Sequence, residues 1–199
     1  LDGRARYSFG GSDQLAQQLR MGAPADVFLS ASPRYTRKLF AEALVGTPVE
    51  FATNRLVLLV PRANPARIRV AGDISRPGVR LVVAAENVPA GAYALEALRR
   101  LSLRRSLANV VSREPDVKAV AAKVALGEAD AGFVYATDVG PVASRVRVIP
   151  LPRRASPVAR YEAAVSSSSP RLAAARAFVA RLLSPRGRAR LAAAGFGAP

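Results

Sequence analysis

The stretch FGGSDQLAQQL, residues 9–19, joins two glycines and a serine directly to an amphipathic helix pattern. Two of its leucines are four residues apart and share one helical face, which predicts a helix over 12–22. Ser12 is a good N-cap residue, and the glycines let the backbone approach a ligand without a Cβ in the way. A helix start also presents free N–H groups and the positive end of the helix dipole. The stretch therefore predicts an anion cradle, although an ordinary capped turn gives the same pattern.

Two further helix starts have the same character. VPAGAYALEAL (88–98) places a proline, Ala90 and a glycine at the start of a helix, and EPDVKAV (114–120) starts another at Asp116 and Val117. Each follows an expected strand. In open α/β sheets, the carboxyl ends of the strands form the usual ligand crevice. We therefore expect the three helix starts to converge on one anion.

Strands and helices alternate along most of the chain. This order predicts an α/β fold with a mainly parallel sheet. Predicted strands cover 25–32, 55–61, 79–85, 108–112, 131–137, 145–152 and 159–168, and predicted helices cover 12–22, 33–45, 88–101, 116–126, 169–184 and 184–195.

The composition excludes several kinds of site. The 199 residues contain no cysteine and no histidine, which removes disulfides, thiolate nucleophiles, Ser-His-Asp triads and zinc sites built on these ligands. No apolar run reaches the roughly 18 residues that a membrane-spanning helix needs. No pair of carboxylates is spaced for acid/base catalysis. We therefore predict a protein that is not an enzyme.

The formal net charge of +16 favours anionic partners, which include nucleic acid, anionic lipid and small oxyanions. An arginine-rich solvated surface, of the kind that a G+C-rich genome encodes, explains the charge equally well. A basic nucleic-acid-binding protein is therefore one alternative. Against it, the chain has 7 Phe, 5 Tyr and no Trp, and it lacks any known reader motif.

Four segments, in this order, resemble the extracytoplasmic molybdate-binding proteins of ABC importers: FGGSDQLAQQLRMGAPADVFLSAS (9–32), ENVPAGAYALEALRRL (86–101), GEADAGFVYATDV (127–139) and AFVARLLSPRGRARLAAAGF (177–196). The resemblance covers almost the whole chain. It implies the two-lobe type II periplasmic binding protein fold, with a mainly parallel sheet flanked by helices in each lobe. The implied first lobe combines residues 1–55 with 161–199, the second spans 56–160, and the hinges lie near Asn54 and Tyr161.

The resemblance also implies the ligand set. Ser12 is expected to offer its hydroxyl and amide, Ala90 and Val117 their amides, and Tyr135 its phenol, so no side chain ligates a metal directly. The implied ligand is molybdate, with tungstate as a second ligand because both ions present four oxygens on a similar sphere. No cofactor is expected.

The same resemblance implies an extracytoplasmic monomer, periplasmic or membrane-anchored, that closes its lobes on the ligand. Its expected partner is the membrane permease of an ABC transporter, and no nucleic acid partner is expected. A domain for another oxyanion, such as sulfate, and an effector-sensing domain are further alternatives, because both share the two-lobe plan.

Two departures from the family pattern bear on the site. In the family, a strand, a loop with another ligand serine and a helix precede the FGGS segment. They are missing from the sequence given, as is a signal segment, so the first lobe is expected to be incomplete. Asp13 stands where a small or hydroxyl residue is usual. We expect its carboxylate to point outward, because it would otherwise repel a bound oxyanion.

Overall fold

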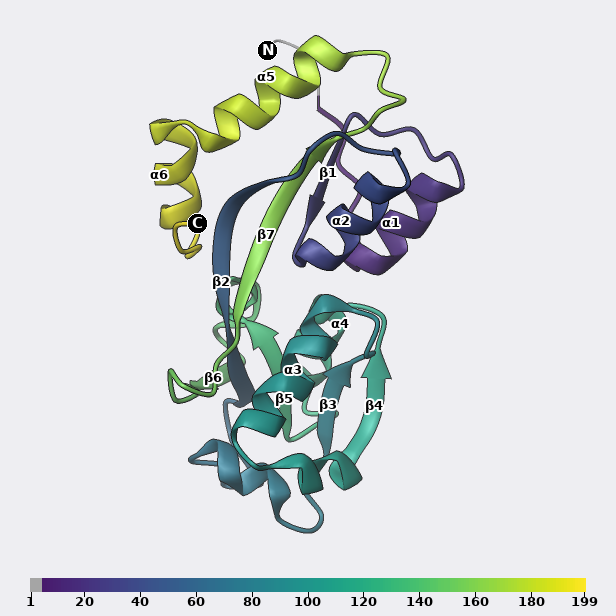
Figure 1. Ribbon diagram of the computed structural model, residues 1–199. Coiled ribbons are helices and arrows are strands. Elements are labelled where there is room, and N and C mark those ends of the chain that lie inside the picture. Colours follow the sequence, from purple (N-terminus) through teal and green to yellow (C-terminus); the bar gives the residue numbers. More distant parts are fainter. Residues whose placement is uncertain (1–4) are drawn as a thin grey trace. The chain divides into compact units, whose positions relative to one another are not determined.

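The computed structural model describes residues 5–199 and divides the chain into two compact units (Figure 1). Unit 1 comprises the chain up to Thr53 together with Arg160–Pro199, and unit 2 comprises Asn54–Ala159. The chain crosses from one unit to the other inside two strands, β2 (Val49–Pro61) and β7 (Val158–Val165). Each unit is therefore assembled around parts of these two strands.

Unit 1 packs helices against an antiparallel strand pair. Strand β1 pairs with β7, with Val27 opposite Val165 and Ser30 opposite Glu162. Its core joins Ala16 and Leu19 of the first helix to residues of β1 and of the second helix. Besides β2 and β7, the elements of unit 1 are α1 (Ser12–Arg20), β1 (Val27–Ser30), α2 (Pro33–Ala41), α5 (Leu172–Leu183) and α6 (Pro185–Ala193).

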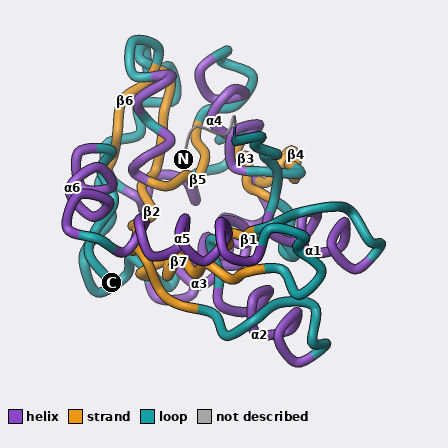
Figure 2. The backbone as a smooth tube through the Cα atoms, turned by 90° about the horizontal axis from the view of Figure 1, so that it is seen from above, coloured by secondary structure: helices purple, strands orange, loops and turns teal. Residues whose placement is uncertain are grey.

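Unit 2 is built on a mixed sheet. Strand β3 is parallel to both β4 and β5, whereas β2 is antiparallel to β5 and β6. The alternation of helices and strands along the backbone can be followed in Figure 2. The strands of unit 2 besides β2 are β3 (Leu81–Ala84), β4 (Val110–Glu114), β5 (Ala131–Tyr135) and β6 (Val146–Ile149), and its α-helices are α3 (Pro89–Arg100) and α4 (Val117–Ala125). Its short 3₁₀ helices are η1 (Ala71–Ser75), η2 (Arg104–Asn109), η3 (Ala136–Asp138) and η4 (Gly140–Val142).

The predicted α/β alternation is confirmed, but the expectation of a mainly parallel sheet holds only for β3, β4 and β5. Parallel neighbours need a crossover connection, usually a helix, and α3 and α4 lie in the connections from β3 to β4 and from β4 to β5. The pairing of β1 with β7 is antiparallel instead. These two strands are far apart in the sequence, and β7 enters unit 1 as a continuous strand. No crossover therefore fixes their relative direction.

Helix α4 lies directly on the sheet because Gly132 of β5 has no side chain. A Cβ at Gly132 would lie 2.8 Å from Cγ1 of Val120 and 2.9 Å from Cγ2 of Val124. Both valines are fully buried on α4. This close contact fixes the position of α4 relative to β5.

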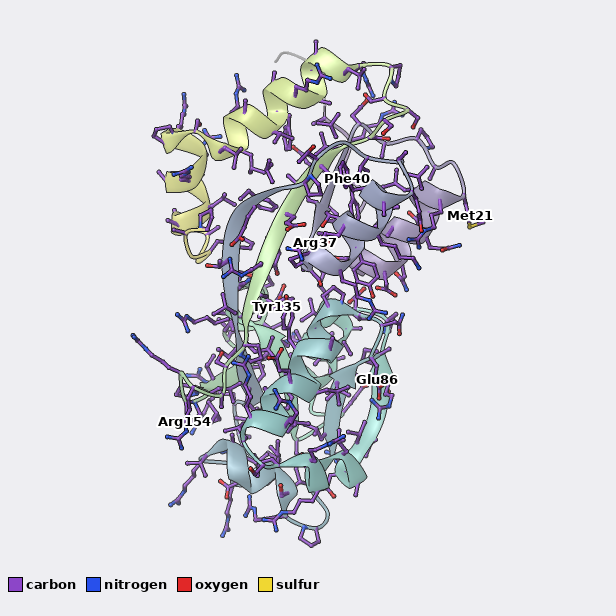
Figure 3. The ribbon with its side chains drawn as sticks, in the orientation of Figure 1. Met21, Arg37, Phe40, Glu86, Tyr135 and Arg154 are labelled. Atoms are coloured by element: carbon purple, nitrogen blue, oxygen red, sulfur yellow. The ribbon has the colours of Figure 1, made fainter. Side chains whose placement is uncertain are left out.

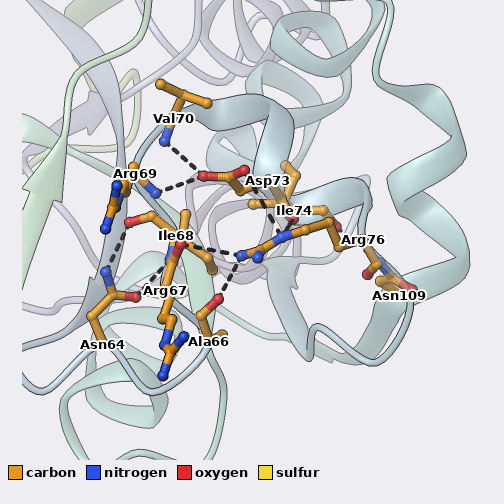
Figure 4. Close-up of polar contacts among 10 residues, drawn as sticks. All are labelled: Asn64, Ala66, Arg67, Ile68, Arg69, Val70, Asp73, Ile74, Arg76 and Asn109. Atoms are coloured by element: carbon orange, nitrogen blue, oxygen red, sulfur yellow. Dashed lines mark hydrogen bonds and ion pairs between the residues drawn. The ribbon is translucent and has the colours of Figure 1, made fainter.

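The loop between β2 and β3 folds on itself through polar contacts (Figure 4). The carboxylate of Asp73 accepts hydrogen bonds from the amides of Arg69 (2.7 Å) and Val70 (3.0 Å), and these bonds hold the pKa of Asp73 below its ordinary value. The Asn109 amide group donates to the Arg76 carbonyl oxygen at 2.9 Å. These contacts order an arginine-rich loop without involving a site residue.

Candidate functional site

Three of the predicted site residues lie at one edge of unit 2. Because β3 is parallel to both β4 and β5, the carboxyl ends of these strands meet at the same edge of the sheet. Ala90 lies in the first turn of α3, which follows β3, and Val117 begins α4, which follows β4. Tyr135 is the last residue of β5. The strand directions thus bring Ala90, Val117 and Tyr135 together.

The start of α3 approaches β3 closely because residue 91 is glycine. A Cβ at Gly91 would lie 2.1 Å from the carbonyl oxygen of Ala85 and 2.4 Å from that of Ala84. Ala90 is only 2% exposed, and within residues 5–199 its amide donates no hydrogen bond. The first N–H groups of a helix have no acceptor within the helix, so this amide can donate to a ligand or to water.

The start of α4 has fewer unpaired backbone N–H groups than the sequence suggests. Asp116 is its N-cap, and the Asp116 carboxylate accepts a hydrogen bond from the Ala119 amide at 2.8 Å. The expectation of an uncovered helix start is wrong to this extent, because aspartate is a strong capping residue. The Val117 amide, however, has no acceptor in the part of the chain that the structure describes. It is therefore available as the second N–H donor at this edge.

Tyr135 is held by an aromatic contact with α3. Its ring meets that of Tyr93 edge to face, with the ring centroids 6.4 Å apart. Tyr135, labelled in Figure 3, is 3% exposed, and its hydroxyl oxygen is shielded from solvent. The contact fixes a phenolic hydroxyl relative to the helix that carries Ala90.

Ser12 belongs to unit 1, where its role differs from the predicted one. The N-cap of α1 is Gly11, so the prediction that Ser12 caps the helix is wrong, and Ser12 is the first helical residue. Its buried Oγ accepts a hydrogen bond from the Ala31 amide at 3.0 Å. A serine hydroxyl that accepts one bond still has its own proton to donate. Ala31 directly follows β1, so in unit 1 as well the candidate donor lies at a strand end.

The Asp13 carboxylate is partly buried, and the expectation that it points away from a bound oxyanion stays a prediction. Its Oδ1 is shielded from water, and its charge acts on Tyr35 of α2. Burial raises the pKa of the Tyr35 hydroxyl, Arg34 lowers it and Asp13 raises it. Helices α1 and α2 contact each other, so this charge lies within electrostatic reach of α2.

Asp138 is a residue whose environment the sequence did not reveal. It ends η3, three residues after Tyr135, and burial raises the pKa of its carboxyl to about 6. The segment GFVYATD contained the only signal, a carboxylate close to a predicted ligand. Its burial depends on tertiary packing and is invisible in a local pattern.

In the part of the chain that the structure describes, neither a metal cluster nor the hollow in unit 1 is found at the edge of unit 2. Within residues 5–199, no three acidic, histidine or cysteine side chains lie together in a way that could hold a metal ion. A hollow of about 290 Å³ is lined mainly by apolar residues, among them Phe51, Leu191 and Phe196. It contains none of the predicted site residues.

Every helix in the described range is too short or too polar to span a bilayer.

Comparisons with known proteins identify the family of the chain. Residues 2–197 match the family of bacterial extracellular solute-binding proteins. Molybdate-binding protein ModA of Mycobacterium tuberculosis is 40% identical over 195 residues, which cover 97% of this chain and 73% of that protein.

Two solved structures extend the similarity to the fold. The periplasmic molybdate-binding protein of Azotobacter vinelandii matches with a TM-score of 0.85 and 25% identity, over 96% of this chain and 86% of the other. The substrate-binding domain of a putative molybdenum ABC transporter from Clostridium difficile matches with a TM-score of 0.72 and 30% identity, over 100% and 87%. The similarity therefore covers both units.

Proposed function

This chain belongs to the family of bacterial extracellular solute-binding proteins, and from that premise we propose that it is the receptor that captures molybdate for an ABC importer. The relative from M. tuberculosis and both solved structures carry molybdate or molybdenum in their names. The observation that supports the proposal is the edge of unit 2, where the starts of α3 and α4, with Ala90 and Val117, and the end of β5, with Tyr135, follow the carboxyl ends of parallel strands.

Uncharged donors are well suited to a buried dianion. Hydrogen bonds to an ionised acceptor are roughly twice as strong as neutral ones, and fixed N–H dipoles avoid the desolvation of a second charge. The amides of Ala90 and Val117 also lie at helix starts, where the helix dipole favours negative charge. The net charge of +16 raises the rate at which an anion arrives without taking part in the site. The same donors are proposed to accept tungstate, which presents the same oxygens.

We further propose that the two units are the two lobes of the receptor. The boundaries inside β2, at Thr53 and Asn54, and inside β7, at Ala159 and Arg160, are the proposed hinges. Closure would add the Ser12 hydroxyl and amide to the three donors of unit 2. Binding would then select the closed form, which the permease distinguishes from the empty one. Small-angle X-ray scattering checks this, because saturating molybdate should decrease the radius of gyration.

The proposed setting is extracytoplasmic, periplasmic or at the outer side of the membrane, and the proposed protein is a monomer without cofactor or catalytic activity.

A thermal unfolding series against molybdate, tungstate, sulfate and phosphate tests the ligand assignment. Molybdate at 100 times its Kd should stabilise the protein by about 2.7 kcal/mol and raise the melting temperature accordingly. A rise with sulfate and none with molybdate would refute the assignment.

Replacing Tyr135 by phenylalanine should weaken molybdate binding roughly 30-fold, or about 2 kcal/mol, because the phenolic hydrogen bond to the dianion is lost. The ring and its contact with Tyr93 remain. Isothermal titration calorimetry measures the change in Kd. The matched control is Tyr93→Phe, which removes a hydroxyl from the neighbouring ring and should leave Kd within about twofold. Equal Kd values for wild type and Tyr135→Phe would remove Tyr135 from the site.

A further inference from the structure

Asp138 carries a partly buried carboxyl group three residues after the proposed ligand tyrosine, Tyr135. Its Oδ2 is shielded from solvent, and within residues 5–199 this oxygen has no hydrogen-bond partner. The backbone of Tyr135 donates a hydrogen bond to the carboxylate. A buried oxygen without a partner is costly, most of all when the group is charged, so this position calls for an explanation.

The charges that act on Asp138 come from the start of α4. Burial is the largest influence and raises the pKa of Asp138 to about 6, the Tyr135 backbone hydrogen bond and Lys118 lower the pKa, and Asp116 raises it. Asp116 and Lys118 are the residues on either side of Val117. Helix α4, which begins at Val117, also contacts η3, which ends at Asp138, so the start of α4 and Asp138 belong to neighbouring elements.

A dianion held at the Val117 amide would act on the same carboxyl. Two negative charges in a site shielded from water repel an ionised neighbour strongly, which favours the protonated form of that neighbour. A protonated carboxyl is neutral and can also donate its proton in a hydrogen bond. Asp138 is thus placed to oppose the ligand when it is ionised and to accept it when it is protonated.

We propose that Asp138 belongs to the oxyanion site and takes up a proton when the dianion binds, so that capture is tighter in acidic than in alkaline solution. The inference rests on the proposed function. It adds to the proposed site a residue whose charge responds to pH, which none of the proposed hydrogen-bond donors does.

The test is the pH dependence of molybdate affinity. Each unit by which the ligand raises the pKa of Asp138 makes binding tenfold weaker once the pH exceeds the pKa of both states. We expect Kd to rise about tenfold between pH 5.5 and pH 8.0. Calorimetry in two buffers of different ionisation enthalpy should show an uptake of roughly half a proton near pH 6.5.

The variant Asp138→Asn cannot ionise and should bind with the same Kd at both pH values and without proton uptake. The matched control is Glu86→Gln, which removes a carboxylate from the loop after β3 at the same edge of the sheet. The Glu86 side chain is 65% exposed, so its loss should leave the tenfold change intact. Should Asp138→Asn fail to fold, the proton uptake of the wild-type protein decides the question.

The outcomes separate the two proposals. Tight binding of molybdate by the wild type with equal Kd at pH 5.5 and 8.0, or with no proton uptake, would overturn the role of Asp138 and leave the proposed function standing. A pH dependence that persists in Asp138→Asn would overturn it as well. Absence of molybdate binding at every pH would overturn the proposed function, and this inference with it.

Discussion

Replacing Val117 by proline is expected to raise the Kd for molybdate roughly 100-fold, about 2.7 kcal/mol, while the protein stays folded. Val117 is the first residue of α4, where proline is favoured because its missing N–H would be unpaired in the helix anyway. Asp116 before it has φ −156° and ψ 171°, an extended conformation that a following proline accepts. The substitution therefore deletes one N–H donor and leaves the helix intact.

The Val117→Pro result is measured by calorimetric titration, with circular dichroism to show that the helices remain. Val117→Ala is the matched control, because it shortens the side chain but retains the amide, and it should bind nearly as well as the wild type. An affinity that falls equally in both variants would mean that the side chain, not the N–H group, contacts the ligand. Wild-type affinity in Val117→Pro would exclude this amide from the site.

The second large effect is a loss of stability, expected when Gly91 is replaced by alanine. Alanine there would place a Cβ 2.1 Å from the carbonyl oxygen of Ala85, and backbone atoms cannot move aside as a flexible side chain can. Alanine gains about 1 kcal/mol of helix propensity over glycine, but the overlap forces the start of α3 away from β3. We expect a net loss of about 3 kcal/mol in the free energy of unfolding.

Urea denaturation of Gly91→Ala checks this expectation. Gly72→Ala serves as the control. Gly72 lies in the same unit as Gly91, and a Cβ at Gly72 would meet no atom within 4 Å. Its stability should lie within about 0.5 kcal/mol of the wild type. A Gly91→Ala protein as stable as the wild type would show that α3 does not need its close approach to the strand.

The sequence predicted the order of elements well because helix and strand periods are local properties. The starts of α3 and α4, with Ala90 and Val117, followed from proline and aspartate signals that act within one turn. The direction of β7 beside β1 could not be predicted this way, since their pairing joins segments more than 100 residues apart.

The errors at individual site residues have the same origin. Gly11, not Ser12, caps α1, and the Ser12 hydroxyl bonds the Ala31 amide, a partner 19 residues along the chain. The partial burial of Asp138 arises where η3 contacts α4, which no local pattern reveals. These environments arise from tertiary contacts, so a residue pattern gives the identity of a candidate ligand more readily than its surroundings.

The most direct test of the account is a crystal structure grown with molybdate, in which the anomalous signal of molybdenum locates the ion. The account predicts one strong peak whose surrounding oxygens accept hydrogen bonds from the amides of Ala90 and Val117 and from the hydroxyls of Tyr135 and Ser12. A peak that lies instead among exposed arginines, or at a position remote from the carboxyl ends of β3, β4 and β5, would contradict it.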